Sequence, residues 1–170
     1  NTMSDFSSHS KPDEAVVTHL DWKISVEFAE ERLLAEATYT VRVLNKKATA
    51  LDLDTAHLDI LGVQANDWTP LNFTLHPLDE SKPHLGRRLE IDLQEVQAKD
   101  YHNITVFYAT TKFCSALQWL PASQTAGKKY PYLFTQCQAI HARSLVPCQD
   151  RCGVKMTYTA KVTVPEWATC

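Results

Sequence analysis

The side chains best suited to chemistry gather between Phe134 and Asp150, in the run FTQCQAIHARSLVPCQD. Cys137 and His141 are the one pairing of a nucleophile with a base in this run. No third group that would orient the histidine is evident, and neither are oxyanion donors, so the sequence disfavours a thiol hydrolase. We expect Arg143 and Asp150 to form an ion pair that braces the segment rather than to act in catalysis.

A metal site in the same region would need more donors than the sequence offers. Cys148 and Cys152, in the spacing C-x-x-x-C, could supply two zinc ligands, with His141 nearby. A closed tetrahedral site needs four, and the zinc-peptidase motif HExxH does not occur in the sequence. We therefore expect no metal site and no cofactor in this chain.

The composition bounds the remaining possibilities. A chain of 170 residues with 44% hydrophobic and 22% charged residues suits one globular domain. A net charge of -3 with no basic block argues against nucleic acid or an anionic membrane as the partner. Five cysteines at irregular spacing do not form a disulfide framework, so we expect reduced thiols and a cytoplasmic location.

Alternation of apolar and polar residues predicts that strands position this run. In residues 18–28 the residues Leu20, Trp22, Ile24, Val26 and Phe28 share one face, which is typical of a half-buried strand. Glu95–Asp100 could form a single helical turn, and residues 1–17 are expected to be a flexible lead-in to one β domain over residues 18–170. Further strands are predicted at residues 33–44, 50–53, 58–63, 71–75, 89–93, 103–109 and 154–164. The predicted fold class is all-β, with an antiparallel or mixed sheet.

One long segment, residues 110–153, resists the strand pattern. It is rich in aromatic, amide and cysteine residues. Long irregular segments in compact domains usually carry function, so the candidate site is expected here.

Ordered motifs in and after this segment resemble the N-terminal domain of the leukotriene A4 hydrolase family of zinc aminopeptidases. They are ALQWL at 116–120, QTAG at 124–127, PYLF at 131–134, QCQAIHAR at 136–143, PCQD at 147–150, and the pattern VK-TY-A-V-VP at 154–165. The resemblance implies a saddle-like β domain that packs over a thermolysin-like catalytic domain and closes one side of its active-site cleft.

The resemblance also implies a substrate contact. In the family the second glutamine of QCQ contacts the bound substrate, which places Gln138 in that role with Gln136 beside it. A neutral amide can donate to a peptide's carbonyl and accept from its amine. If the segment is extended, Gln136 and Gln138 lie on one face and Cys137 on the other. The alternative is that both amides satisfy backbone groups of the loop.

For the full-length enzyme the resemblance implies zinc and a peptide substrate, with epoxide hydrolysis as a possible second activity. The family's HExxH and GxMEN motifs are absent from this sequence, so the chain alone is expected to be inactive. Arg151-Cys152-Gly153 stands where the family has a Thr-Pro-Ser type triplet, and the family continues after Pro165 with further strands. We therefore expect the last strands of the domain and the whole catalytic domain to be missing, whether in a fragment or in a truncated isoform.

A second hypothesis from another class stays open. A truncated, non-catalytic homologue would act as a protein-interaction module. The surface left uncovered should be apolar, and it would bind a catalytic domain or a second copy of the chain.

Overall fold

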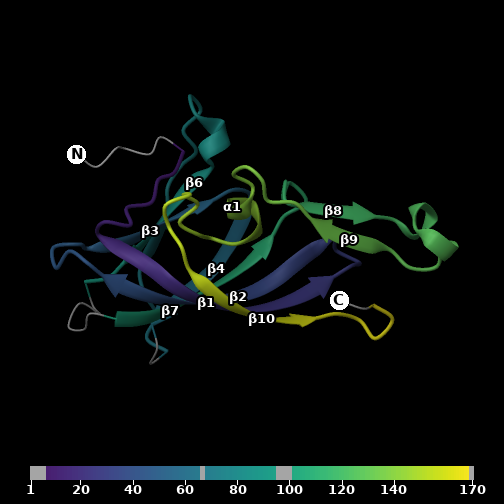
Figure 1. Cartoon of the computed structure of the whole chain (residues 1–170), viewed down its shortest axis with the longest axis horizontal. Coiled ribbons are helices and arrows are strands. Elements are labelled where there is room, and N and C mark those ends of the chain that lie inside the picture. Colours follow the sequence, from purple (N-terminus) through teal and green to yellow (C-terminus); the bar gives the residue numbers. More distant parts are fainter. Residues whose placement is uncertain (1–6, 66–67, 95–100, 169–170) are drawn as a thin grey trace.

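The computed structural model describes residues 7–65, 68–94 and 101–168, and within these its strands form three sheets (Figure 1). The largest has the order β10-β1-β2-β7-β4 and is built from β1 (Ala15–Glu27), β2 (Arg32–Val43), β4 (Leu58–Ala65), β7 (Tyr101–Thr110) and β10 (Thr157–Thr163). Its strand pairs are antiparallel, except that β10 runs parallel to β1.

Two smaller sheets complete the fold. The three-stranded antiparallel sheet has the order β3-β6-β5, with β3 (Ala50–Thr55), β5 (Phe73–Leu75) and β6 (Arg87–Asp92). The third is a hairpin of β8 (Leu117–Leu120) and β9 (Tyr132–Thr135). The helical pieces are short: η1 (Pro83–Leu85), η2 (Ala122–Gln124), η3 (Ala126–Lys128) and α1 (Ala142–Leu145). No helix among the described residues has the length and apolarity to cross a membrane.

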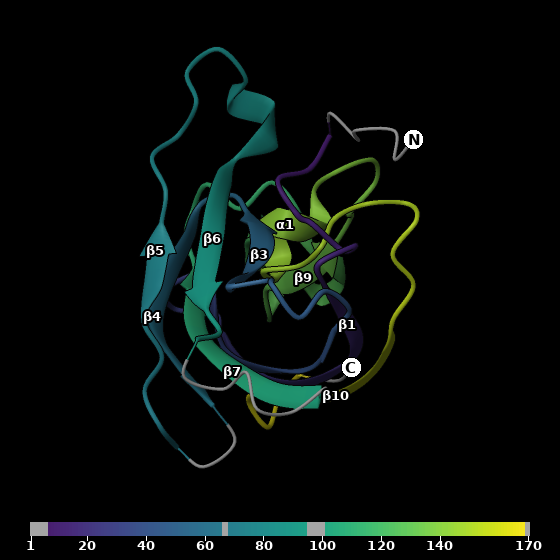
Figure 2. The ribbon, with the colours of Figure 1, turned by 90° about the vertical axis from the view of Figure 1, so that its left-hand side faces the viewer.

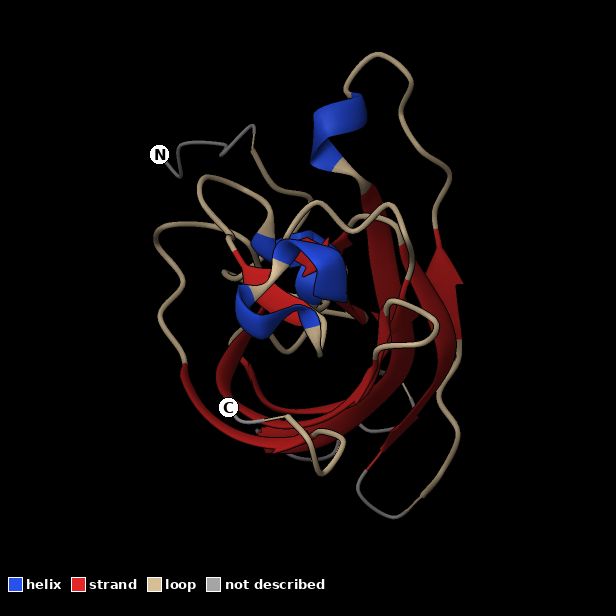
Figure 3. Ribbon diagram, turned by 90° about the vertical axis from the view of Figure 1, so that its right-hand side faces the viewer, coloured by secondary structure: helices blue, strands red, loops and turns tan. Residues whose placement is uncertain are grey.

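The five-stranded sheet curves into a trough, and α1 lies on its concave side (Figures 2 and 3). The three-stranded sheet packs against the same side, and the hairpin β8–β9 extends beyond the other end of the trough (Figure 1). This arrangement confirms the expected all-β, saddle-like fold with mixed and antiparallel sheets.

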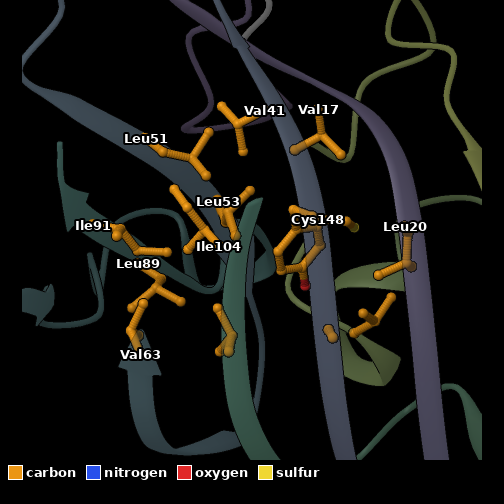
Figure 4. Packing of buried hydrophobic residues seen from close by; sticks show 14 of the residues in the cluster. Val17, Leu20, Val41, Leu51, Leu53, Val63, Leu89, Ile91, Ile104 and Cys148 are labelled. Atoms are coloured by element: carbon orange, nitrogen blue, oxygen red, sulfur yellow. The ribbon is translucent and has the colours of Figure 1, made fainter. Parts of the chain in front are cut away.

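The main core fills the space between the two larger sheets (Figure 4). β1 and β2 contribute Val17, Leu20 and Val41, and the facing sheet contributes Leu51, Leu53, Leu89 and Ile91, all at most 2% exposed. A second cluster joins the far end of β1 to the hairpin and contains Ile24, Val26, Leu33, Cys114, Ala116 and Leu117. The two apolar clusters lie along the trough. The part of the chain that lies between them therefore has apolar packing at both of its ends.

The register of β1 explains why its apolar pattern changes phase. The buried residues Ala15 and Val17 stand at odd positions, whereas the buried residues Leu20, Ile24 and Val26 stand at even positions. The pairing with β2 shifts between Val17 and His19. A bulge at this point adds one residue to the strand, so both runs of apolar residues face the concave side.

The structure departs from the sequence-based expectation in residues 110–153. This segment contains the hairpin β8–β9 and the helix α1 as well as irregular chain. Both strands have only four residues, and β9 carries apolar side chains on both faces, so no alternation marked them. The helical turn expected at residues 95–100 falls outside the described residues.

Candidate functional site

Gln136 and Gln138 lie in a turn, not in an extended strand. β9 ends at Thr135, and the backbone N–H of Gln136 donates to the carbonyl of Ala116 (2.9 Å). The N–H of His141 then donates to the carbonyl of Cys137 (2.9 Å), which closes the turn. The shared face expected from an extended segment is therefore absent, because the chain reverses direction at this point.

The two glutamine side chains differ in what they do. The Oε1 of Gln136 accepts a hydrogen bond from the backbone N–H of Gln138 (2.9 Å), so this amide satisfies the loop itself. Gln138 stands at the exposed apex of the turn, and its peptide bond to Ala139 is cis. Gln136 is exposed as well, so the two differ in the loop bond that Gln136 makes and not in exposure. The substrate role of either residue stays a prediction.

Arg143, on α1, anchors the segment. Its guanidinium is 1% exposed and pairs with the carboxylate of Asp150 (2.9 Å), which confirms the expected ion pair. The same group donates to the carbonyls of Leu85 (2.9 Å) and Ser7 (2.7 Å). One side chain therefore ties α1 to the loop after it, to η1 and to the N-terminal residues.

A buried carboxylate on β3 makes a second tie. Asp54 is fully buried and accepts hydrogen bonds from the Ser8 hydroxyl (2.5 Å), the His9 N–H (2.6 Å) and the Asp150 N–H (3.0 Å). Its backbone pairs in both directions with Cys148. Residues 8 and 9, which fall in the expected lead-in, are thus attached to the sheet, and the domain boundaries themselves stay a prediction.

Gln149 holds the free edge of β1. Its Nε2 donates to the carbonyl of Ala15 (2.8 Å), and its Oε1 accepts from the N–H of Val17 (2.9 Å). β10 pairs with β1 only from His19 onward, so the buried amide of Gln149 takes the place of a neighbouring strand. Sequence reasoning missed this residue, and its place in the PCQD motif was the only available signal.

Two tyrosines of the large sheet donate hydrogen bonds to backbone carbonyls of α1 and of the residues that follow it. The hydroxyl of Tyr39, which is fully buried, donates to the carbonyl of Pro147 (2.5 Å). The hydroxyl of Tyr108 donates to the carbonyl of Leu145 (3.0 Å) and accepts from the indole N–H of Trp22 (2.9 Å). Burial raises the pKa of both phenols, so they stay protonated donors.

Two thiols of this region, those of Cys137 and Cys148, are poorly suited to act as nucleophiles. Burial raises the pKa of the Cys137 and Cys148 thiols, whereas a nucleophile needs the opposite shift. The His141 imidazole bonds to Ser115 through Nδ1 (2.6 Å). The described residues contain no group of three or more His, Cys, Asp and Glu side chains that could hold a metal ion, so they offer no fit for zinc.

Beside the hairpin lies an apolar groove of about 450 Å³. Its aromatic lining includes Tyr130, Tyr132, Phe134 and Trp167, each at least 37% exposed. Val162 of β10 also lines this groove. All seven residues of β10 are exposed as well. The expectation that an uncovered apolar surface binds a partner stays a prediction.

The model of the Peptidase M1 N-terminal domain family matches residues 16–170. Among curated relatives, leukotriene A-4 hydrolase of Xenopus laevis is 39% identical over 96% of this chain and 26% of its own length. Leucine aminopeptidase 2 of Aspergillus terreus is 36% identical over 97% of this chain and 25% of its own length. The chain thus spans about a quarter of the curated relatives it matches.

Solved structures give the same match. Yeast LTA4 hydrolase in complex with bestatin superposes with a TM-score of 0.87 and 36% identity, over 97% of this chain and 25% of that chain. A two-domain M1 zinc metallopeptidase bound to L-arginine superposes at 0.70 with 20% identity over 94% of this chain and 34% of its own, which shows the shared fold.

Proposed function

Because this chain belongs to the Peptidase M1 N-terminal domain family, we propose that in its intact protein it forms one wall of the substrate cleft of a zinc aminopeptidase. The substrate is a peptide, and Gln138 contacts its N-terminal residue. We also propose a cytoplasmic location for the intact protein, because its cysteines do not have the spacing of a disulfide framework.

One observation carries the proposal: Gln138 stands exposed at the apex of a turn whose flanks are fixed to the β domain. Such a residue can offer both amide groups to a peptide, and because the backbone on either side is held, binding orders mainly its side chain. The similarity to yeast LTA4 hydrolase, solved with bestatin, extends over 97% of this chain and supports a ligand-facing role.

Zinc belongs to this proposal only through the rest of the protein. When bound, it would supply Lewis-acid activation of the peptide carbonyl and of water. The described residues of this chain hold no group of metal ligands. The role proposed for this chain is to bind and orient the peptide. Arg143, Asp54 and Gln149 act by fixing the segment that carries Gln138.

The test compares Gln138→Ala with Gln94→Ala, an exposed glutamine after β6, in the intact protein. Loss of one hydrogen bond to the peptide should raise KM for an aminoacyl arylamide about 3- to 10-fold. Leukotriene A4 is tested as a second substrate, because the Xenopus relative is named leukotriene A-4 hydrolase. Equal KM values for the two variants would remove Gln138 from the proposal, and an intact protein without peptidase activity would overturn the function.

A second candidate is a non-catalytic module that self-associates. It is favoured by β10, which is exposed along its whole length, and by the adjoining aromatic groove. A second copy could pair antiparallel about Ala160, with Tyr158 opposite Val162 on one face and no like charges opposed. Light scattering should then give a dimer mass that Val162→Lys halves. A monomer at high micromolar concentration would exclude this candidate.

A further inference from the structure

Two adjacent residues, Ser115 and Ala116, hold the two ends of the turn that carries Gln138. At its start, the N–H of Gln136 donates to the carbonyl of Ala116 (2.9 Å). At its end, the imidazole of His141 bonds through Nδ1 to the hydroxyl of Ser115 (2.6 Å). Ser115 and Ala116 immediately precede β8, so both ends of the turn are bonded to the same short stretch of chain.

Ser144, on α1, connects the two ends. Its side chain is fully buried, and its hydroxyl donates to the carbonyl of His141 (2.7 Å). The same oxygen accepts from the N–H of Ala116 (3.1 Å) and from the hydroxyl of Ser115 (3.3 Å). Because Ser144 donates its only hydroxyl hydrogen to the carbonyl of His141, its oxygen can only accept in its other hydrogen bonds.

Ser115 has one hydroxyl hydrogen, which can go either to Ser144 (3.3 Å) or to Nδ1 of His141 (2.6 Å). With that hydrogen on Ser144, Ser115 accepts at its own oxygen and Nδ1 of His141 carries a proton. The bonds then run from Nδ1–H of His141 to Ser115, on to Ser144, and back to the carbonyl of His141, in a closed chain whose members reinforce one another. In this arrangement His141 is a donor to Ser115 and not its base. With the Ser115 hydrogen donated to Nδ1 instead, the chain of bonds is open.

We propose that Ser115, His141 and Ser144 are positioning residues for Gln138, which they serve by holding the turn 136–141 in one conformation. The inference rests on the proposed function only for what Gln138 contacts. The proposal includes the Nδ1–H tautomer of His141, which closes the circuit and concerns this chain alone.

Ser115 is the point at which to break the circuit. Its side chain is exposed, so its removal should leave global stability nearly unchanged. Ser115→Ala removes the acceptor of His141 and frees one end of the turn, whereas Ser115→Thr keeps the hydroxyl. Ser81→Ala is the matched control, because Ser81 is also exposed and its hydroxyl bonds to the carboxylate of Asp79 (2.6 Å).

The first experiment is NMR of the 170-residue chain with ¹⁵N-labelled histidine. We expect the Nδ1–H form at His141 in the wild type, its loss in Ser115→Ala and its return in Ser115→Thr. Amide exchange at residues 138–141 should rise about 3- to 10-fold in Ser115→Ala and stay unchanged in Ser81→Ala. An Nε2–H tautomer in the wild type, or equal exchange in the two alanine variants, would overturn the proposal.

The second experiment separates positioning from substrate contact in the intact protein. Ser115→Ala should raise KM about 2- to 5-fold without changing kcat, and Ser115→Thr should restore KM. If Gln138→Ala raises KM while Ser115→Ala leaves it unchanged, positioning is wrong and the proposed function stands. If neither variant changes KM but the tautomer is Nδ1–H, the circuit exists and the proposed function of Gln138 fails.

Discussion

Replacing Arg143 with alanine is the sharpest perturbation of the segment that carries the site. The guanidinium is 1% exposed and the Asp150 side chain 15%, so the pair is largely shielded from water. Arg143→Ala leaves the carboxylate without its cation and the carbonyls of Leu85 and Ser7 without their donor. Removing one partner of a buried ion pair costs about 3–5 kcal/mol.

We take the lower part of that range, about 3–4 kcal/mol, because Asp150 keeps some contact with water. A domain of this size loses about 2–4 °C in Tm for each kcal/mol, so Tm should fall by roughly 6–16 °C. Urea unfolding followed by tryptophan fluorescence gives the free energy of unfolding, and thermal unfolding by circular dichroism gives Tm.

Arg32→Ala is the matched control. Arg32 also pairs with a carboxylate, that of Glu27 at 2.6 Å, but the two side chains are 45% and 28% exposed. Exposed pairs contribute little to stability, because water and salt screen the two charges. If Arg143→Ala and Arg32→Ala destabilise the chain equally, the reasoning from burial is refuted. Arg143→Lys should recover only part of the loss, because lysine cannot reach three acceptors with one planar group.

Three further predictions concern buried polar groups. Gln149→Ala should lower the free energy of unfolding by about 2–4 kcal/mol, since two buried backbone groups of β1 lose their partners; a loss below about 0.5 kcal/mol in urea unfolding would contradict the edge role. Tyr39→Phe should cost about 1–3 kcal/mol in the same assay by leaving the carbonyl of Pro147 unpaired, and an unchanged midpoint would disprove that bond. Burial raises the pKa of Asp52, so the folded state binds this proton more readily than the unfolded state does. The free energy of unfolding should therefore fall as pH rises from about 4 through the raised pKa. Asp52→Asn should flatten that slope, and an unaltered slope would mean that another group causes it.

The strands could be predicted because most of them carry one buried and one exposed face. In β2, Leu33, Ala35, Ala37, Tyr39 and Val41 are buried at every second position, so alternation alone marks the strand. β1 was found by the same signal, although the bulge after Val17 was not. The short hairpin β8–β9 escaped because each of its strands has only four residues and β9 begins with three consecutive apolar ones, so no alternation marks it.

The site was only partly predictable. The Arg143–Asp150 pair could be foreseen because the two residues lie close in the sequence and carry opposite charges. The turn at Gln138 and the role of Gln149 could not, since both depend on where distant strands lie. Gln149 bonds to residues more than 130 positions away, and no local pattern encodes that contact.

We expect Gln138 to contact the substrate from the wall of the cleft. A crystal structure of the intact protein with bestatin, the compound present in the yeast relative, would show this contact. The side-chain amide of Gln138 should lie within hydrogen-bonding distance of the bound compound, about 2.7–3.2 Å. Bestatin bound with Gln138 turned away, or with its amide engaged only by the protein, would rule the contact out.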